Sequence, residues 1–219
     1  MFAVVLAGGE NRRLPVTKGL IDIGGRRLIE TILDRLGTHF DGLAISTNEP
    51  EKYFYLGVPL IGDVYPVRGP MTGIFSALSW LENVEGGAKD AFFVACDMPF
   101  INVELAARLY LERAPGWDVL APVWQGRPEP LFSFYSTGCL PLMENSLLAG
   151  QSGLNKLSLR QFLGTASTRF LEEKVVKEID PLGRSFININ TEDDLKSALK
   201  IVFSVSPGEK PARVQPEGF

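Results

Sequence analysis

Two adjacent glycines followed by basic residues form the segment of this sequence best suited to bind an anion. Gly8 and Gly9 end an apolar run, Arg12 and Arg13 follow them, and Lys18 closes the segment. Adjacent glycines allow a tight turn that exposes backbone N–H groups, with no Cβ to keep an anion at a distance. Arginine and lysine then add full positive charges. This order predicts a cradle for a triphosphate, and a simple strand-to-loop turn with solvated basic residues is the alternative.

A carboxylate occupies a similar place later in the chain. Asp97 comes just after the apolar run 91–95, and Pro99 stops the run from continuing. A carboxylate at such a strand end, opposite the glycine segment, can bind Mg²⁺, which prefers one or two carboxylates together with phosphate oxygens. The alternative is that Asp97 caps the next helix, but Asn102 stands directly before that helical pattern and is the better cap. We therefore predict that Asp97 is a metal ligand.

Polar residues also follow two other predicted strands, where they could contact a nucleoside. Ser46 and Asn48 both carry donors and acceptors, as the edge of a purine requires. Asp63 can accept hydrogen bonds from nucleotide hydroxyls or base nitrogens, or it is a loop aspartate that faces water. Gly73 lies in the stretch 68–74, where glycines beside a proline and before a helix let the main chain approach a flat ligand.

Length, charge and cysteine content narrow the class of protein. With 219 residues the chain can form one well-buried domain, and a net charge of −4 argues against nucleic acid as a partner. The only two cysteines, Cys96 and Cys139, are far apart and outside any metal-binding pattern, which argues against zinc and disulfides and favours the cytoplasm. The sequence has no run of eighteen apolar residues, so we expect neither export nor a membrane span.

Short apolar runs alternate with amphipathic helical patterns along the chain. This alternation predicts an α/β fold: a single, three-layer, Rossmann-like domain with a mostly parallel sheet covered by helices on both faces. We expect strands at residues 2–6, 42–46, 58–61, 91–95, 119–121 and 185–189, and helices at 28–36, 72–81, 103–113, 138–148 and from about 190 to 203. The domain then spans residues 1–203, and residues 204–219, rich in Pro, Gly and charge, form a disordered tail.

In this order, the segments resemble the molybdenum cofactor guanylyltransferase family. The resemblance runs from about Phe2 to the helix after Asn190. It is carried by the stretches Leu-Ala-Gly-Gly-x-x-Arg-Arg with a later lysine at 6–18, Gly-Pro-Met-Thr-Gly-Ile at 69–74, Cys-Asp-Met-Pro-Phe at 96–100, Gly-Arg-Pro-Glu-Pro-Leu at 126–131 and Asn-Ile-Asn-Thr-Glu at 188–192. The last two distinguish this branch from the wider nucleotidyltransferase clan, and the resemblance implies the nucleotidyltransferase version of the fold.

The resemblance also implies a reaction: transfer of GMP from Mg²⁺-bound GTP to the terminal phosphate of molybdenum-loaded molybdopterin, with release of pyrophosphate. The resemblance implies that the nucleotide is contacted by the main chain of Leu6, Ala7 and Gly8, and that its phosphate oxygens are neutralised by Lys18. Asp63 helps to select guanine or ribose, and Asp97 holds Mg²⁺. That Arg12 and Arg13 meet the triphosphate is an inference from the residues themselves. Proteins that insert the finished cofactor are further expected partners.

The acceptor side of the cleft is implied by similarity alone. Residues 127–130, Asn188 and Asn190 are expected to lie toward the pterin, where amides and a guanidinium could bind its heteroatoms. The proline-rich piece could instead simply end a strand, and Asn190 could simply begin a helix.

Two departures from the family pattern leave alternatives open. Leu14 and Pro15 follow the arginines where the family usually has Met-Gly, and Ser46 stands where the family often has asparagine. Two other functions therefore remain: a related nucleotidyltransferase that uses CTP or another acceptor, and a non-catalytic nucleotide-binding module that delivers cofactor.

Overall fold

The fold is built on one twisted sheet. The computed structural model describes residues 1–8, 17–84, 88–152 and 157–205. Within them eight strands form a sheet in the order β3-β2-β1-β4-β7-β5-β6, with β8 also paired to β5. The strands are β1 (Phe2–Leu6), β2 (Gly42–Ser46), β3 (Leu60–Ile61), β4 (Asp90–Ala95), β5 (Val119–Trp124), β6 (Arg127–Pro128), β7 (Phe132–Ser136) and β8 (Thr168–Leu171).

Strand β1 lies at the centre of the parallel part of the sheet. It pairs in parallel with β2 on one side, where Leu6 is opposite Ser46, and with β4 on the other, where Leu6 is opposite Ala95. The chain therefore moves outward from β1 to β2 and β3, then crosses over to β4. In α/β sheets ligands bind at such a switch point, outside the carboxyl ends of the strands. Strand β7 is antiparallel to β4 and β5, and β6 is antiparallel to β5.

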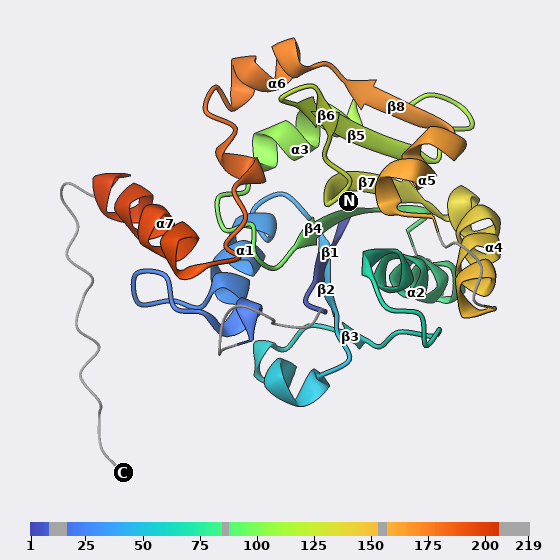
Figure 1. The fold of residues 1–219 in the computed structure, drawn as a ribbon, viewed down its shortest axis with the longest axis horizontal. Helices are drawn as coiled ribbons and strands as arrows, with labels where there is room; N and C mark the ends of the chain where they lie inside the picture. The colour runs from blue at the N-terminus through green and yellow to red at the C-terminus, as the bar shows by residue number, and fades with distance from the viewer. Residues whose placement is uncertain (9–16, 85–87, 153–156, 206–219) are drawn as a thin grey trace.

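Helices cover both faces of the sheet, which confirms the three-layer α/β prediction (Figure 1). One face packs against α1 (Leu28–Leu36), α3 (Val103–Tyr110) and α6 (Glu173–Ile179). The other packs against α2 (Pro70–Asn83), α4 (Leu140–Gln151) and α5 (Leu159–Thr165). The side chains of β1 alternate between these two cores, with Val5 in the first and Val4 in the second, as a strand buried on both faces requires.

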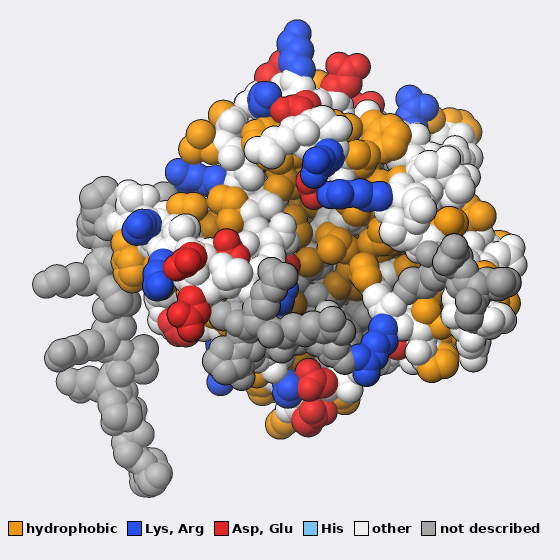
Figure 2. All heavy atoms as spheres, in the orientation of Figure 1, with side chains coloured by type: hydrophobic (Ala, Val, Ile, Leu, Met, Phe, Trp, Pro, Cys, Tyr) orange, Lys and Arg blue, Asp and Glu red, His pale blue; other side chains and the backbone are white. Residues whose placement is uncertain are grey.

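The last helix forms a smaller core of its own. Helix α7 (Glu192–Val205) packs through Ala198 against Leu28 at the start of α1 and Phe100 after β4. Figure 2 shows apolar side chains in a hollow at the centre of one face of the molecule, with lysine and arginine side chains near its edge. Of the helices in the described ranges, none has the length and apolar character needed to cross a bilayer.

Most predicted elements are present, some with different ends. Residues 2–6, 42–46 and 28–36 form β1, β2 and α1 as predicted, whereas β3 is limited to Leu60–Ile61 and α3 ends at Tyr110. The strand predicted at 185–189 is wrong. The carboxylate of Asp180 accepts from the backbone N–H groups of Arg184 (3.0 Å) and Ser185 (2.8 Å), and this turns the chain into a short 3₁₀ helix, Arg184–Phe186.

Candidate active site

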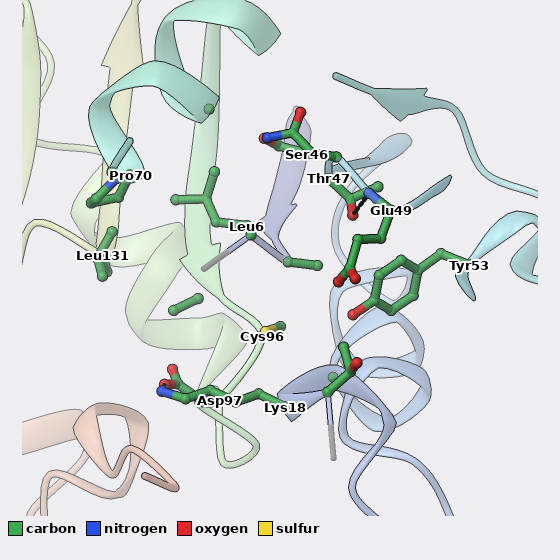
Figure 3. Close-up of a pocket in the computed structure, with 18 of the residues that line it drawn as sticks. Leu6, Lys18, Ser46, Thr47, Glu49, Tyr53, Pro70, Cys96, Asp97 and Leu131 are labelled. Carbon is green, nitrogen blue, oxygen red and sulfur yellow. Dashed lines mark hydrogen bonds and ion pairs between the residues drawn. The ribbon is translucent and has the colours of Figure 1, made fainter. Parts of the chain in front are cut away.

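Apart from residues 127–130, the predicted site residues in the described ranges come together in one cleft at the carboxyl ends of β1 to β4. The cleft has a volume of about 1170 Å³. Figure 3 shows side chains from several segments pointing into it. Its lining comes from the ends of strands β1 to β4 and the residues after them, the start of α2, residues 17–19, Leu131, and the segment with Asn188 and Asn190. The lining residues are Leu6, Ala7, Gly8, Thr17, Lys18, Gly19, Ser46, Thr47, Asn48, Glu49, Lys52, Tyr53, Asp63, Arg68, Gly69, Pro70, Gly73, Ala95, Cys96, Asp97, Leu131, Asn188 and Asn190.

Backbone hydrogen bonds continue past the ends of the strands and hold these segments at the cleft. The N–H of Ala7 donates to the carbonyl of Ser46 (2.8 Å), and the N–H of Cys96 donates to the carbonyl of Leu6 (3.0 Å). On the outer side, the N–H of Thr47 donates to the carbonyl of Ile61 (2.8 Å). The residues that follow the strands are therefore fixed by the same ladder as the strands, and rigid elements hold ligand-binding groups more accurately than free loops do.

Lys18 and Asp97 meet directly. The Lys18 Nζ atom donates to Asp97 Oδ2 at 2.7 Å, and it also donates to the side-chain oxygen of Asn190. The three residues are far apart in the sequence: Lys18 begins the 3₁₀ helix Lys18–Leu20, Asp97 follows β4, and Asn190 precedes α7. The cation and the carboxylate predicted to act on one triphosphate therefore share a cavity, and Figure 3 shows them at the same end of it.

Asp97 has one oxygen left over. Its Oδ1 atom is buried and has no hydrogen-bond partner among the described residues. A buried carboxylate oxygen without a partner is costly, so this atom is suited to a ligand that the protein itself does not supply. The described residues contain no cluster of three or more histidine, cysteine or acidic side chains that could hold a metal alone. A single carboxylate fits Mg²⁺, which takes its other ligands from phosphates and water.

The neighbouring thiol is not a nucleophile. Cys96 lies between β4 and Asp97 and is buried. Burial, together with the nearby charge of Asp97, raises the pKa of the Cys96 thiol to about 12, although Lys18 acts in the opposite direction. Since only a thiolate attacks efficiently, covalent chemistry at Cys96 is disfavoured.

Asn48 and Asp63, which follow β2 and β3, hold each other on the side of the sheet away from β4 and Asp97. The side-chain amide of Asn48 donates to Asp63 Oδ2 (2.7 Å), and the backbone N–H of Asp63 donates back to Asn48 Oδ1 (2.8 Å). Burial raises the pKa of the Asp63 carboxyl, and the bond from Asn48 opposes that rise. The pair therefore presents a partly desolvated carboxylate that is already oriented, as recognition of a base or sugar requires.

Gly73 lines the cleft and also allows α2 to pack closely on the sheet. A Cβ at this position would lie 2.6 Å from Ser46 Oγ and 3.2 Å from a methyl group of Leu6. Only glycine leaves room for this contact. Ser46 is consequently buried against α2, at 3% exposure, whereas Asn48 two residues later is exposed.

This arrangement can be compared with known proteins. The family model described as "MobA-like NTP transferase domain" matches residues 3–170, which include all of β1 but its first residue, the cleft carboxylates and Lys18. The chain belongs to the MobA-like NTP transferase family.

Relatives in this family match the chain along most of its length. A protein from Natranaerobius thermophilus named "Probable molybdenum cofactor guanylyltransferase" is 34% identical over 203 residues, which cover 90% of this chain and 94% of the relative. A "Molybdenum cofactor guanylyltransferase" from Desulfosudis oleivorans is 30% identical, with coverage of 89% and 92%. The solved structure of molybdopterin-guanine dinucleotide biosynthesis protein A from Archaeoglobus fulgidus has a TM-score of 0.78 and 27% identity, covering 93% of this chain and 100% of that one.

The segment with the two asparagines lies beyond the part matched by the family model but within the cleft. The N–H of Ile189 donates to the backbone carbonyl of Asp97 (2.9 Å), which holds this segment against the end of β4. Thr191 provides the side-chain cap of α7, because its hydroxyl accepts from the N–H of Asp194 (3.2 Å). The side chain of Asn190 is therefore not the helix cap and is instead bonded to Lys18.

Other predicted residues lie outside the described cleft or outside the described ranges. Residues 127–130 form β6 and the turn after it, and the cleft lining reaches only Leu131 of this region. Gly9, Arg12 and Arg13 lie outside the residues that the structure describes, as do Leu14 and Pro15.

Several residues that line the cleft were not predicted from the sequence: Thr17, Glu49, Lys52 and Tyr53. Arg68 lies in the predicted ligand-binding stretch 68–74, but no role was predicted for its side chain. Lys52 Nζ donates to Thr17 Oγ1 (2.9 Å) and Glu49 Oε1 (2.5 Å), so it joins the connection after β2 to the segment before Lys18. The position of Glu49 and Lys52 just after a central strand was an available signal, whereas Tyr53 looks like an ordinary core aromatic.

Proposed function

We propose that this chain transfers GMP from GTP to the terminal phosphate of molybdenum-loaded molybdopterin, which yields molybdopterin guanine dinucleotide and pyrophosphate. Membership of the MobA-like family and the names of the relatives support this reaction. The single structural observation that carries it is the meeting of Lys18 with Asp97 in a cleft at the switch point of the sheet.

The nucleotide side of the reaction depends on positioning and charge. Attack of the molybdopterin phosphate on the α-phosphorus of GTP, with pyrophosphate as the leaving group, brings two anions together, so neutralising groups must be in place before the reaction. The main chain of Ala7 and Gly8 stands at the end of β1, and Lys18 supplies an ammonium group beside it. In this proposal Lys18 leaves Asp97 and binds phosphate oxygens, and Arg12 and Arg13 contribute further positive charge.

Asp97 is the residue that would hold Mg²⁺. When bound, the ion would neutralise charge that develops on the phosphate oxygens. The unpartnered Oδ1 atom of Asp97 gives it a free coordinating oxygen, and the departure of Lys18 would free Oδ2 as well.

Asp63 and its partner Asn48 select the guanosine part. The N1–H and 2-amino groups of guanine are adjacent donors, and a carboxylate offers two acceptors in the matching geometry. Gly73 and Ser46 form a close-packed part of the cleft lining beside Leu6 at the end of β1. Asn188 and Asn190 are the residues that would face the acceptor, because both line the cleft and their segment is bonded to Lys18 and to the main chain of Asp97.

We also propose that the protein acts in the cytoplasm, and that its small-molecule partners are GTP and a molybdopterin-type acceptor. Proteins that insert the dinucleotide cofactor receive the product, and neither nucleic acid nor a membrane takes part.

Incubation with different nucleotides tests the proposal. The purified protein is mixed with molybdenum-loaded molybdopterin, Mg²⁺ and either GTP, CTP or ATP, and pyrophosphate and the dinucleotide product are measured. We expect both products with GTP, and neither with GTP when Asp97 is replaced by asparagine. Release of pyrophosphate with CTP alone would show a cytidylyl transfer and overturn the assignment. Tight binding of GTP by a folded protein without turnover would favour a delivery module.

A further inference from the structure

Tyr53 is a buried phenol in the wall of the cleft. It lies in the connection between β2 and β3, and its side chain has 0% exposure. Its ring points toward the end of the cleft that holds Lys18 and Cys96 (Figure 3). A Cβ on Gly19 would lie 2.9 Å from the Tyr53 hydroxyl oxygen, so this hydroxyl is immediately beside the main chain that carries Lys18.

The hydroxyl of Tyr53 has no hydrogen-bond partner among the described residues. The other fully buried tyrosine behaves differently: the Tyr135 hydroxyl donates to the carbonyl of Pro130 at 2.9 Å. Buried polar groups in folded proteins are almost always paired, because burial removes their bonds to water. An exception in the wall of a ligand cleft calls for a partner that is not part of the described protein.

The surroundings of Tyr53 indicate the chemistry of that partner. Burial, with the neighbouring Cys96 and Glu49 acting in the same direction, raises the pKa of the Tyr53 phenol well above its usual range, so the group remains a hydrogen-bond donor. The hydroxyl lies beside the main chain of Gly19, the residue after Lys18, and the nearby carboxylate of Glu49 is already paired with the ammonium of Lys52. A donor beside a lysine suits an anionic oxygen of a phosphate group.

We propose that Tyr53 donates a hydrogen bond from its hydroxyl to a phosphate oxygen of the polyphosphate chain of the bound nucleotide. Lys18 and Gly19 belong to the same short 3₁₀ helix, and Gly19 lies beside the Tyr53 hydroxyl. A phosphate group that draws Lys18 away from Asp97 is therefore bound next to this hydroxyl, and the contact forms. Tyr53 is then a binding residue of the cleft. This inference rests on the proposed function, because it requires a nucleotide triphosphate at this end of the cleft.

Replacement of Tyr53 by phenylalanine tests the inference, because it removes only the hydroxyl. We expect the melting temperature of the ligand-free protein to stay the same or rise, since a buried donor without a partner is lost. The Kd for GTP, measured by calorimetry, is expected to rise about tenfold, as for loss of a bond to a charged group. The Kd for pyrophosphate is expected to rise in parallel, while weak binding of guanosine stays unchanged.

Tyr135→Phe is the matched control. It also removes a buried hydroxyl, but one that is bonded inside the protein, so it is expected to lower the melting temperature and leave the Kd for GTP unchanged. A Tyr53→Phe protein that melts at a lower temperature and binds GTP as the wild type does would show an internal bond and overturn the inference. Unchanged melting and unchanged GTP binding would overturn it as well. Absence of GTP binding by the wild type would instead refute the proposed function, and this inference with it.

Discussion

Replacement of Lys18 by methionine is predicted to change metal binding in opposite directions with and without nucleotide. In the ligand-free protein the Lys18 ammonium occupies one oxygen of Asp97 at 2.7 Å. A divalent cation that binds Asp97 without nucleotide is repelled by this ammonium if it uses Oδ1, and must displace it if it uses Oδ2. Methionine keeps most of the length and apolar character of the side chain but removes the charge, so the carboxylate becomes open to the metal.

The size of the effect follows from how exposed the ion pair is. The side chains of Lys18 and Asp97 are 28% and 11% exposed. Fully exposed pairs contribute about 0.2–1 kcal/mol, and removing one partner of a fully buried pair costs about 3–5 kcal/mol. A pair of intermediate exposure is worth about 1–2 kcal/mol by this comparison. Since each 1.4 kcal/mol corresponds to about a factor of ten, Lys18→Met should strengthen nucleotide-free metal binding by about 5- to 30-fold.

Binding of Mn²⁺, followed by the loss of the electron paramagnetic resonance signal of the free ion, measures this directly. Lys52→Met is the matched control, because Lys52 is another cleft lysine but is bonded to Glu49 and Thr17 rather than to Asp97. It should leave nucleotide-free Mn²⁺ binding unchanged, and Asp97→Asn should abolish that binding. In the presence of GTP, Lys18→Met should weaken Mn²⁺ binding, because the phosphates have lost their ammonium partner. Equal or weaker Mn²⁺ binding by Lys18→Met without nucleotide would refute the reasoning.

Three further predictions concern other residues of the cleft. Asp97→Ala should lower turnover about a hundredfold or more in a pyrophosphate-release assay while the protein stays folded, because it removes the proposed metal ligand; near-normal turnover would exclude that role. Burial raises the pKa of Asp63, so the folded protein binds this proton more tightly than the unfolded chain and the ionised group costs stability at neutral pH. Asp63→Asn should therefore raise the melting temperature at pH 7, with the gain vanishing as the pH falls below the ordinary carboxyl range; a gain that is the same at every pH would contradict this. Gly73→Ala should lower the free energy of unfolding by about 1–3 kcal/mol in urea titrations, because its Cβ would overlap Ser46. Gly164→Ala, whose Cβ would meet nothing within 4 Å, should instead raise it by about 0.5–1 kcal/mol, and equal effects of the two changes would argue against steric overlap.

The elements that the sequence predicts well are those whose pattern is local. Strands β1 and β2 and helix α1 were predicted with their correct ends, because runs of apolar residues and three- or four-residue spacing are visible without knowledge of the fold. The expected position of Asp97 followed from the rule that residues after parallel strands gather at one edge. That rule was sufficient to bring Asp97, Asp63 and Ser46 to a single cleft.

Features that depend on specific side-chain contacts were not predicted. The segment 185–189 has the apolar composition of a strand, but the carboxylate of Asp180 accepts from the N–H groups of Arg184 and Ser185, and the chain forms the 3₁₀ helix Arg184–Phe186 there instead. The mutual bonds of Asn48 and Asp63 depend on the parallel pairing of β2 with β3, which places the ends of two strands side by side. The unpaired hydroxyl of Tyr53 could not be foreseen, because the lack of a partner is a property of the assembled cleft.

Lys18 joins the proposed metal ligand to the proposed acceptor segment through a single side chain. Its ammonium bonds Asp97, 79 residues away, and Asn190, 172 residues away. Asn190 belongs to the segment whose Ile189 N–H is tied to the carbonyl of Asp97, so the proposed metal ligand and the proposed acceptor segment share both a backbone bond and a lysine. A phosphate that attracts Lys18 therefore releases a carboxylate oxygen and an amide oxygen in the same movement. Binding of the nucleotide would then prepare the site for the metal and the acceptor together. We therefore expect the nucleotide to bind before the acceptor.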